Sequence, residues 1–168
     1  NIFLKKKDNA INIGMVARYD KHKDFNTVFK ALNIIKRKFQ INFFLIGPGL
    51  EHKNNHLNFL IKKNNLSKEV NLIGSFHDLP LIMNGLDIHI LSSFREGSPN
   101  VVLEAMACNT ISIASDVGEA PYLIGNHGKI FEVNNHNSLI FCLEEVLKKI
   151  NENQIKEDLF KPRERILK

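Results

Sequence analysis

Residues 11–46, INIGMVARYDKHKDFNTVFKALNIIKRKFQINFFLI, decide the fold of this chain. Their two ends, Ile11–Val16 and Ile41–Ile46, are short and almost continuously apolar, which is typical of strands buried on both faces. Between them, apolar side chains recur at helical spacing with lysines on the opposite face, which predicts a helix over residues 24–39. Asp24 is expected to cap this helix, because its carboxylate can accept from a free first-turn amide.

The same alternation of strand and helix continues to residue 150. The apolar runs are continuous rather than alternating, which predicts a doubly wound, Rossmann-like α/β domain whose parallel sheet is covered on both faces. We expect this domain to span residues 11–150, with residues 1–10 a linker or domain-connecting segment and residues 151–168 a charged, weakly helical tail. Further strands are expected at residues 70–73, 87–91, 110–114 and 129–133, and further helices at 51–65, 78–85, 98–108, 120–124 and 138–150.

The composition limits the class of protein and the kinds of partner. The chain has 168 residues and a formal net charge of +5, from 23 Lys plus Arg against 18 Asp plus Glu. No apolar run approaches the ~18–20 residues of a membrane helix. Two cysteines without a CxxC pattern favour a reducing, cytoplasmic compartment. The positive charge admits nucleic acid, anionic lipid or a phosphorylated ligand. Nucleic acid is disfavoured, because no aromatic residues interleave with the lysine clusters.

Ligands of open α/β sheets bind at the carboxyl ends of the strands, so the turns at that edge form the candidate site. Arg18, Lys21 and Lys23 follow the first strand. Their charges suit an anion, and the planar guanidinium of Arg18 matches phosphate oxygens. The residues alone leave open a second interpretation, in which these are ordinary solvated surface charges.

The turn before the predicted helix at residues 98–108 is the most informative. Ser98 fits the N-cap and Pro99 the first helical position. The free amides and positive dipole end of such a helix form a phosphate site, and Gly97 leaves room for the ligand.

Two glutamates stand eight positions apart around this turn. Glu104 lies in a segment that is apolar almost all round, as expected of a buried helix, where an unpaired carboxylate is costly. It therefore needs hydrogen-bond donors, either from the protein or from ligand hydroxyls such as those of a ribose. Glu96, in the preceding loop, is placed to reach past the phosphates of an extended ligand.

Residues 93–108, SFREGSPNVVLEAMAC, closely resemble the E-x7-E segment of family 4 glycosyltransferases, which have the GT-B fold. The resemblance runs from about residue 11 to residue 150, and its elements follow the order and spacing of that family. The other matching segments are Gly14-Met15-Val16-Ala17-Arg18 with Lys23-Asp24-Phe25, Gly47-Pro48-Gly49, Val70…Gly74, Asp87-Ile88-His89-Ile90-Leu91-Ser92-Ser93, Ser115-Asp116-Val117-Gly118, and Gly128.

The resemblance implies the C-terminal, donor-binding domain of a retaining nucleotide-sugar transferase. By that likeness Arg18 and Lys23 would contact the donor diphosphate, Glu96 the transferred sugar and Glu104 the ribose. It implies no cofactor, and a UDP-sugar in preference to a GDP-sugar. No metal is expected, since no Asp-x-Asp pair is present. The remaining donor-binding residues would be Gly47, Gly74, Ser75, Phe76, Gly97, Ser98, Pro99, Asn100 and Val101.

The chain departs from the family in one respect. It has Asn109-Thr110-Ile111 where the family usually has Gly-x-Pro, and we expect the turn to survive, because Asn tolerates left-handed backbone. The resemblance also implies an N-terminal domain that binds the acceptor; we expect that domain to lie outside these residues and the chain to be inactive by itself. The family often acts on lipid-linked acceptors in surface polysaccharide or glycoconjugate synthesis, which implies a place in the cytoplasm or at the inner membrane face.

Other functions are weaker alternatives. A nucleotide-sugar epimerase shares the GT-B architecture, and a non-catalytic nucleotide-binding or interaction module could share the sheet. His52 and His56 stand four apart on a predicted helix, where a polar helix face is favoured over a metal-ligand pair. His89, inside an apolar strand, is expected to be a packed core histidine.

Overall fold

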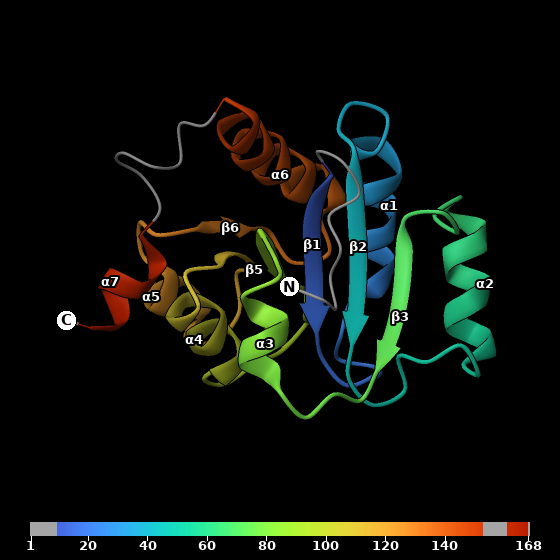
Figure 1. Cartoon of the computed structure of the whole chain (residues 1–168), viewed down its shortest axis with the longest axis horizontal. Helices are drawn as coiled ribbons and strands as arrows, with labels where there is room; N and C mark the ends of the chain where they lie inside the picture. Colours follow the sequence, from blue (N-terminus) through green and yellow to red (C-terminus); the bar gives the residue numbers. More distant parts are fainter. Residues whose placement is uncertain (1–9, 153–160, 168) are drawn as a thin grey trace.

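The computed structural model describes residues 10–152 and 161–167, and within these ranges the chain forms a six-stranded parallel sheet (Figure 1). The strands are β1 (Ile11–Val16), β2 (Ile41–Ile46), β3 (Val70–Gly74), β4 (Ile88–Leu91), β5 (Ile111–Ser115) and β6 (Lys129–Phe131). Their order across the sheet is β3-β2-β1-β4-β5-β6. The predicted doubly wound, Rossmann-like fold is therefore confirmed, and β1 beside β4 marks the point at which the strand order reverses.

Helices cover both faces of this sheet, as Figure 1 shows. The largest hydrophobic cluster packs α1, α2 and α6 against the strands, and two smaller clusters join α3, α4 and α5 to the sheet. All six residues of β2 are buried, which explains why its sequence is almost continuously apolar; the exception, Asn42, donates to Oδ1 of Asn12 at 3.1 Å. The helices are α1 (Phe25–Ile35), α2 (Asn55–Lys63), α3 (Leu79–Met83), α4 (Asn100–Ala107), α5 (Ala120–Ile124), α6 (His136–Asn151) and α7 (Pro162–Ile166).

The structure describes the two predicted terminal segments to different extents. The structure does not describe residues 1–9, so all but one residue of the predicted linker lies outside the described residues. The predicted tail contains α7, which packs against α4.

Several helix boundaries differ from the prediction by a few residues, and local hydrogen bonds explain two of them, the end of α1 and the start of α2. Asp24 caps α1 as expected, but the helix ends at Ile35, because the amides of Arg37 and Lys38 donate to carbonyls three residues back and tighten the chain into turns. α2 begins at Asn55 rather than at residue 51, because the Asn54 side chain accepts from the Leu57 amide at 3.0 Å.

The later start of α2 changes the interpretation of its histidines. His52 precedes the helix, so His52 and His56 do not share a helix face. The Nδ1 atom of His56 is hydrogen-bonded to the Tyr19 hydroxyl instead. The metal-ligand alternative therefore loses the spacing on which it depended.

Asn109 performs the role expected of it at the end of α4. Its φ of 61° is the left-handed conformation that asparagine tolerates better than most residues, and its amide donates to the Met106 carbonyl at 2.9 Å. The turn survives without the glycine that the family usually has there.

His89 is a core residue, as predicted. It is fully buried in β4 between Gly14 of β1 and Ser112 of β5. Neither ring nitrogen has a hydrogen-bond partner among the described residues. Burial, with a smaller contribution from the charge of Lys23, lowers the pKa of His89 from 6.5 to about 3. The imidazole is therefore neutral in the folded protein at physiological pH.

This burial predicts a specific pH dependence of stability. Below pH 6.5 the unfolded chain binds a proton at residue 89, whereas the folded chain does not bind it until about pH 3. The free energy of unfolding therefore decreases as the pH is lowered from 6.5 towards 3. The loss between pH 7 and pH 5 is about 2 kcal/mol from this residue. Urea unfolding of the His89→Leu variant at both pH values should show a smaller drop than in the parent. The exposed His77, changed to Leu, should leave the drop unchanged; an equal drop in His89→Leu would contradict the assignment.

Candidate functional site

The loops after β1 and β4 are joined by backbone hydrogen bonds at the carboxyl edge of the sheet. The Phe94 amide donates to the His22 carbonyl at 2.8 Å, and the Asp24 amide donates to the Ser92 carbonyl at 3.0 Å. Lys23 and Ser93 lie opposite each other in an antiparallel bridge between these bonds. The two loops therefore form one unit, although 70 positions separate Lys23 from Ser93 in the chain.

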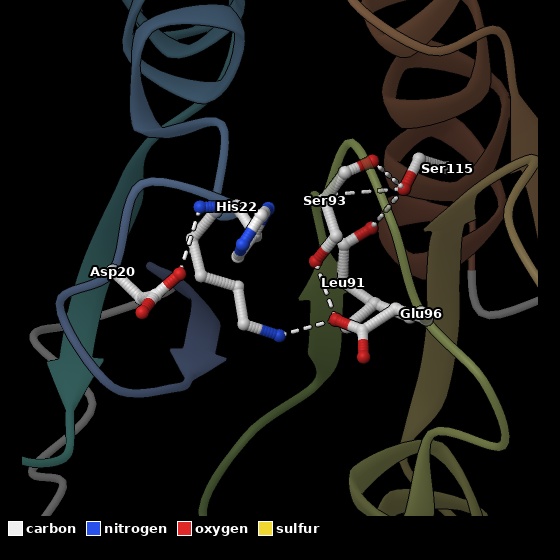
Figure 2. Close-up of polar contacts among 7 residues, drawn as sticks. Asp20, His22, Leu91, Ser93, Glu96 and Ser115 are labelled. Atoms are coloured by element: carbon white, nitrogen blue, oxygen red, sulfur yellow. Dashed lines mark hydrogen bonds and ion pairs between the residues drawn. The ribbon is translucent and has the colours of Figure 1, made fainter.

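Lys23 and Glu96 meet across this unit. The Lys23 ammonium donates to Oε1 of Glu96 in an ion pair whose side chains are 17% and 19% exposed (Figure 2). The Ser93 hydroxyl donates to the same oxygen at 2.7 Å. Partial burial shields such a charge-assisted contact from solvent, so Glu96 is held more firmly than a surface carboxylate.

The backbone of the Glu96 loop rests on Gly118. The Glu119 amide donates to the Gly97 carbonyl at 2.9 Å, and Gly118 has a φ of +52°. A Cβ atom at Gly118 would lie 2.2 Å from the Gly97 carbonyl oxygen and 2.5 Å from that of Glu96. Only glycine allows this approach. Gly97 itself faces open space, with no atom within 4 Å of a Cβ placed there.

A cavity of about 410 Å³ opens beside these residues. Three cationic side chains stand against two carboxylates, an arrangement that suits a ligand carrying both an anionic group and hydroxyls. The backbone hydrogen bond from His22, at 2.8 Å, is the main cause of a lowered pKa at Asp20, which keeps that carboxylate ionised. The cavity is lined by Arg18, Asp20, His22, Lys23, Arg95, Glu96 and Gly97.

A second cavity, of about 510 Å³, adjoins the first and shares Asp20 and Lys23 with it. Lys21 lines only this second cavity. Of the two candidate lysines, the structure therefore places Lys23, and not Lys21, beside Glu96.

Gly47 follows β2 and Gly74 is the last residue of β3, and both are fixed by local packing. The Gly47 amide donates to the Gly74 carbonyl at 2.7 Å, and a Cβ at Gly47 would lie 2.0 Å from the Ala17 carbonyl oxygen. Gly74 has a φ of +72°, and a Cβ there would lie 2.7 Å from Cγ of Glu51, so backbone conformation and packing account for both glycines without a ligand. Ser75 is exposed, while Phe76 is partly buried against the cluster formed by α3 and α4. None of these four residues lines either cavity.

The start of α4 differs from the prediction. Pro99, not Ser98, occupies the cap, and the helix begins at Asn100. Pro99 has a ψ of 93°, which is extended rather than helical, and Ser98 is exposed and makes no capping bond. Ser98, Asn100 and Val101 line neither cavity.

Glu104 is exposed, so the prediction of a buried carboxylate is wrong. α4 buries Val102, Ala105 and Met106, and Glu104 lies on the uncovered side of the helix. Because water solvates its charge, Glu104 needs no donor from the protein. It lines neither cavity, and its role toward a ribose depends on the family resemblance alone.

Sequence reasoning quoted Ser93, Arg95 and Ser115 within matching segments but assigned none of them a role. The two serines follow or end apolar strands at the ligand-binding edge, and that position is the signal that could have identified them. Arg95 adjoins Glu96 in the quoted motif but was assigned no role.

The fold is of the doubly wound α/β class, in which ligands bind at this edge of the sheet. Residues 2–159 match the sequence profile of the family described as Glycosyl transferases group 1. The chain belongs to this family, and its sheet is the Rossmann-like fold of GT-B glycosyltransferases.

Individual relatives agree with this assignment. A Campylobacter jejuni N,N'-diacetylbacillosaminyl-diphospho-undecaprenol alpha-1,3-N-acetylgalactosaminyltransferase is 33% identical over 117 residues, which cover 69% of this chain and 28% of that enzyme. The crystal structure of HepE from Anabaena in complex with UDP and glucose superposes with a TM-score of 0.79 at 21% identity, over 95% of this chain and 43% of the other.

A third match concerns a separate domain. The crystal structure of the C-terminal domain of a group 1 glycosyl transferase (LpcC) from Francisella tularensis superposes with a TM-score of 0.75 at 20% identity, over 94% of this chain and 84% of that one. In contrast, the chain spans only 27% to 40% of the length of the curated relatives that it matches.

The close approach at Gly118 predicts a contrast between two glycines. Gly118→Ala should destabilise the domain by about 1–3 kcal/mol, because the new methyl group meets two carbonyl oxygens in a left-handed backbone conformation. Gly97→Ala should change stability by less than about 1 kcal/mol, since its Cβ meets nothing. Urea unfolding of both variants measures the difference, and equal destabilisation would show that residue 118 does not support the loop as described.

Proposed function

We propose that the chain is the donor-binding part of a retaining glycosyltransferase, which binds a nucleoside diphosphate sugar, with UDP preferred to GDP. The observation that carries this proposal is the single cavity that brings Arg18, Lys23, Glu96 and Gly97 together. The C. jejuni relative is named as a glycosyltransferase, and HepE was crystallised with UDP and glucose, which supports the same ligand class here.

The cavity suits transfer of a sugar from a diphosphate. Breaking the sugar–phosphate bond leaves negative charge on the departing nucleoside diphosphate, and cations fixed beforehand stabilise that charge without reorganisation. Arg18 and Lys23 would supply the cationic charge, so the proposal needs neither a metal ion nor a cofactor. The open backbone at Gly97 allows a phosphate to come close to the loop, and Glu96 would accept hydrogen bonds from sugar hydroxyls.

The acceptor is proposed from the relatives. Two of them, from C. jejuni and Escherichia coli, are named for transfer to sugars linked to diphospho-undecaprenol, a lipid carrier. We propose a glycan or lipid-linked acceptor in polysaccharide or glycoconjugate synthesis, held by a further, N-terminal domain without which this chain is inactive. Among the described residues no helix is long and apolar enough to cross a bilayer. The proposed place is the cytoplasm, with peripheral contact at the inner membrane face.

Calorimetry of the chain with UDP, GDP and ADP tests the proposed ligand. We expect UDP to bind most tightly, and Arg18→Ala and Lys23→Ala each to weaken it about 10-fold or more, because a charge-assisted contact to phosphate is lost. Lys21→Ala is the matched control, since Lys21 does not line the cavity of Glu96 and should leave the affinity for UDP unchanged. A folded chain that binds none of the three diphosphates would falsify the proposal.

The two glutamates should separate nucleotide from sugar. Glu104→Ala is expected to lower the affinity for UDP about 10-fold, because in the proposed function Glu104 binds the ribose. Glu96→Ala is expected to leave the affinity for UDP unchanged and to lower the affinity for the UDP-sugar by a similar factor. Each variant is the other's control in titrations with UDP and UDP-sugars. The site assignment is wrong if both variants bind the conjugates as the parent does.

A further inference from the structure

Ser115, the last residue of β5, bonds to both backbone polar groups of Ser93. The Ser93 amide donates to the Ser115 hydroxyl oxygen at 3.0 Å, and that hydroxyl lies 3.0 Å from the Ser93 carbonyl and 3.4 Å from that of Leu91 (Figure 2). With one proton to donate, it serves the nearer Ser93 carbonyl best. Both serines are 1% exposed, so these backbone groups cannot turn to water instead. Ser115 therefore fixes the loop after β4 to β5.

Ser93, whose backbone is held by Ser115, in turn bonds to the side chain of Glu96. Its hydroxyl donates to Oε1 of Glu96 at 2.7 Å, and Lys23 donates to the same oxygen. No hydrogen bond or ion pair to the other oxygen, Oε2, is found within the part of the chain that the structure describes. Glu96 lines the cavity of about 410 Å³. One carboxylate oxygen is thus held by the protein, and the other remains available to a ligand.

We propose that Ser115 and Ser93 are positioning residues that orient Glu96, so that Oε2 accepts a hydrogen bond from a hydroxyl of the donor sugar. This assignment rests on the proposed function, in which Glu96 meets the sugar. A free glutamate side chain samples many rotamers and must be ordered when ligand binds; hydrogen bonds made in advance reduce that cost.

Ser112 provides the comparison that separates positioning from strand packing. It lies on the same strand, three residues before Ser115, and is fully buried. Its hydroxyl has no hydrogen-bond partner among the described residues. Burial of a serine on β5 is thus not by itself accompanied by such bonds, and the hydrogen bonds of Ser115 link β5 to the loop that carries Glu96.

The test measures the sugar's contribution to binding. Calorimetry gives the Kd of UDP, GDP or ADP, whichever binds the parent most tightly, and of its glucose, galactose and N-acetylgalactosamine conjugates. The ratio of the Kd of the free diphosphate to the Kd of its sugar conjugate gives the contribution of the sugar to binding. Ser115→Ala and Ser93→Ala should each reduce the sugar's advantage about 3- to 10-fold while the Kd of the free diphosphate stays within about twofold. Ser112→Ala should match the parent in both.

A double-mutant cycle adds a readout that a purely structural role would not move. If Ser115 acts through Glu96, Ser115→Ala made in the Glu96→Ala background should have no further effect on the Kd ratio. Should Ser115→Ala fail to fold, as judged by circular dichroism, Ser93→Ala carries the test, because it removes the contact to Glu96 and keeps the backbone bonds to Ser115.

Two results would overturn the assignment: Kd ratios in Ser93→Ala and Ser115→Ala equal to the parent's for every conjugate, or additive effects in the cycle. If the parent chain binds no diphosphate, the proposed function is wrong as well. If the diphosphate binds but the Kd ratios of the variants equal that of the parent, only the positioning role is wrong.

Discussion

The backbone pairing between residues 22–24 and 92–94 is the constraint on which the site depends. The sheet order places β1 beside β4, and the hydrogen bonds from Asp24 to Ser92 and from Phe94 to His22 join the loops that follow these two strands. Lys23 and Glu96 can therefore form an ion pair although the intervening chain builds half of the domain. The chemistry at this edge is a consequence of the strand order, because a sheet wound in one direction would separate the two loops.

Most of the fold could be predicted from the sequence. Mostly apolar runs located all six described strands, since strands buried on both faces are rich in apolar residues; the buried polar exceptions include Asn12, Asn42 and His89. Helix ends were predicted less well. α1 stops before Phe39, although Phe39 still packs on the core, so an apolar residue in register does not prove that the helix continues. α2 starts late because Asn54 captures the Leu57 amide, a competition between caps that hydrophobic spacing does not report.

The site was predicted in part. The motif placed Arg18, Lys23, Glu96 and Gly97 near one another, and one cavity does join them. The prediction for Glu104 was wrong, because an apolar sequence around a helix does not say which side its neighbours leave uncovered. The roles of Ser93 and Ser115 were missed for a different reason. The Ser115 hydroxyl bonds to the backbone of Ser93, 22 residues away, and local sequence does not report that contact. The Ser93 hydroxyl bonds to Glu96 only three residues away, but that contact depends on a loop conformation that the sequence pattern does not specify.

The shared oxygen of Glu96 has a consequence for the lysine that binds it. A lysine ammonium carries three protons, and the ion pair uses one of them, so two donor directions remain on Nζ. The Glu96 carboxylate thus holds the lysine side chain in place and leaves two of its N–H groups free to bind an anion. It removes in advance much of the ~2 kcal/mol of rotamer entropy that a lysine side chain carries. In the proposed function, the donor diphosphate would therefore meet a cation that was already ordered when the chain folded.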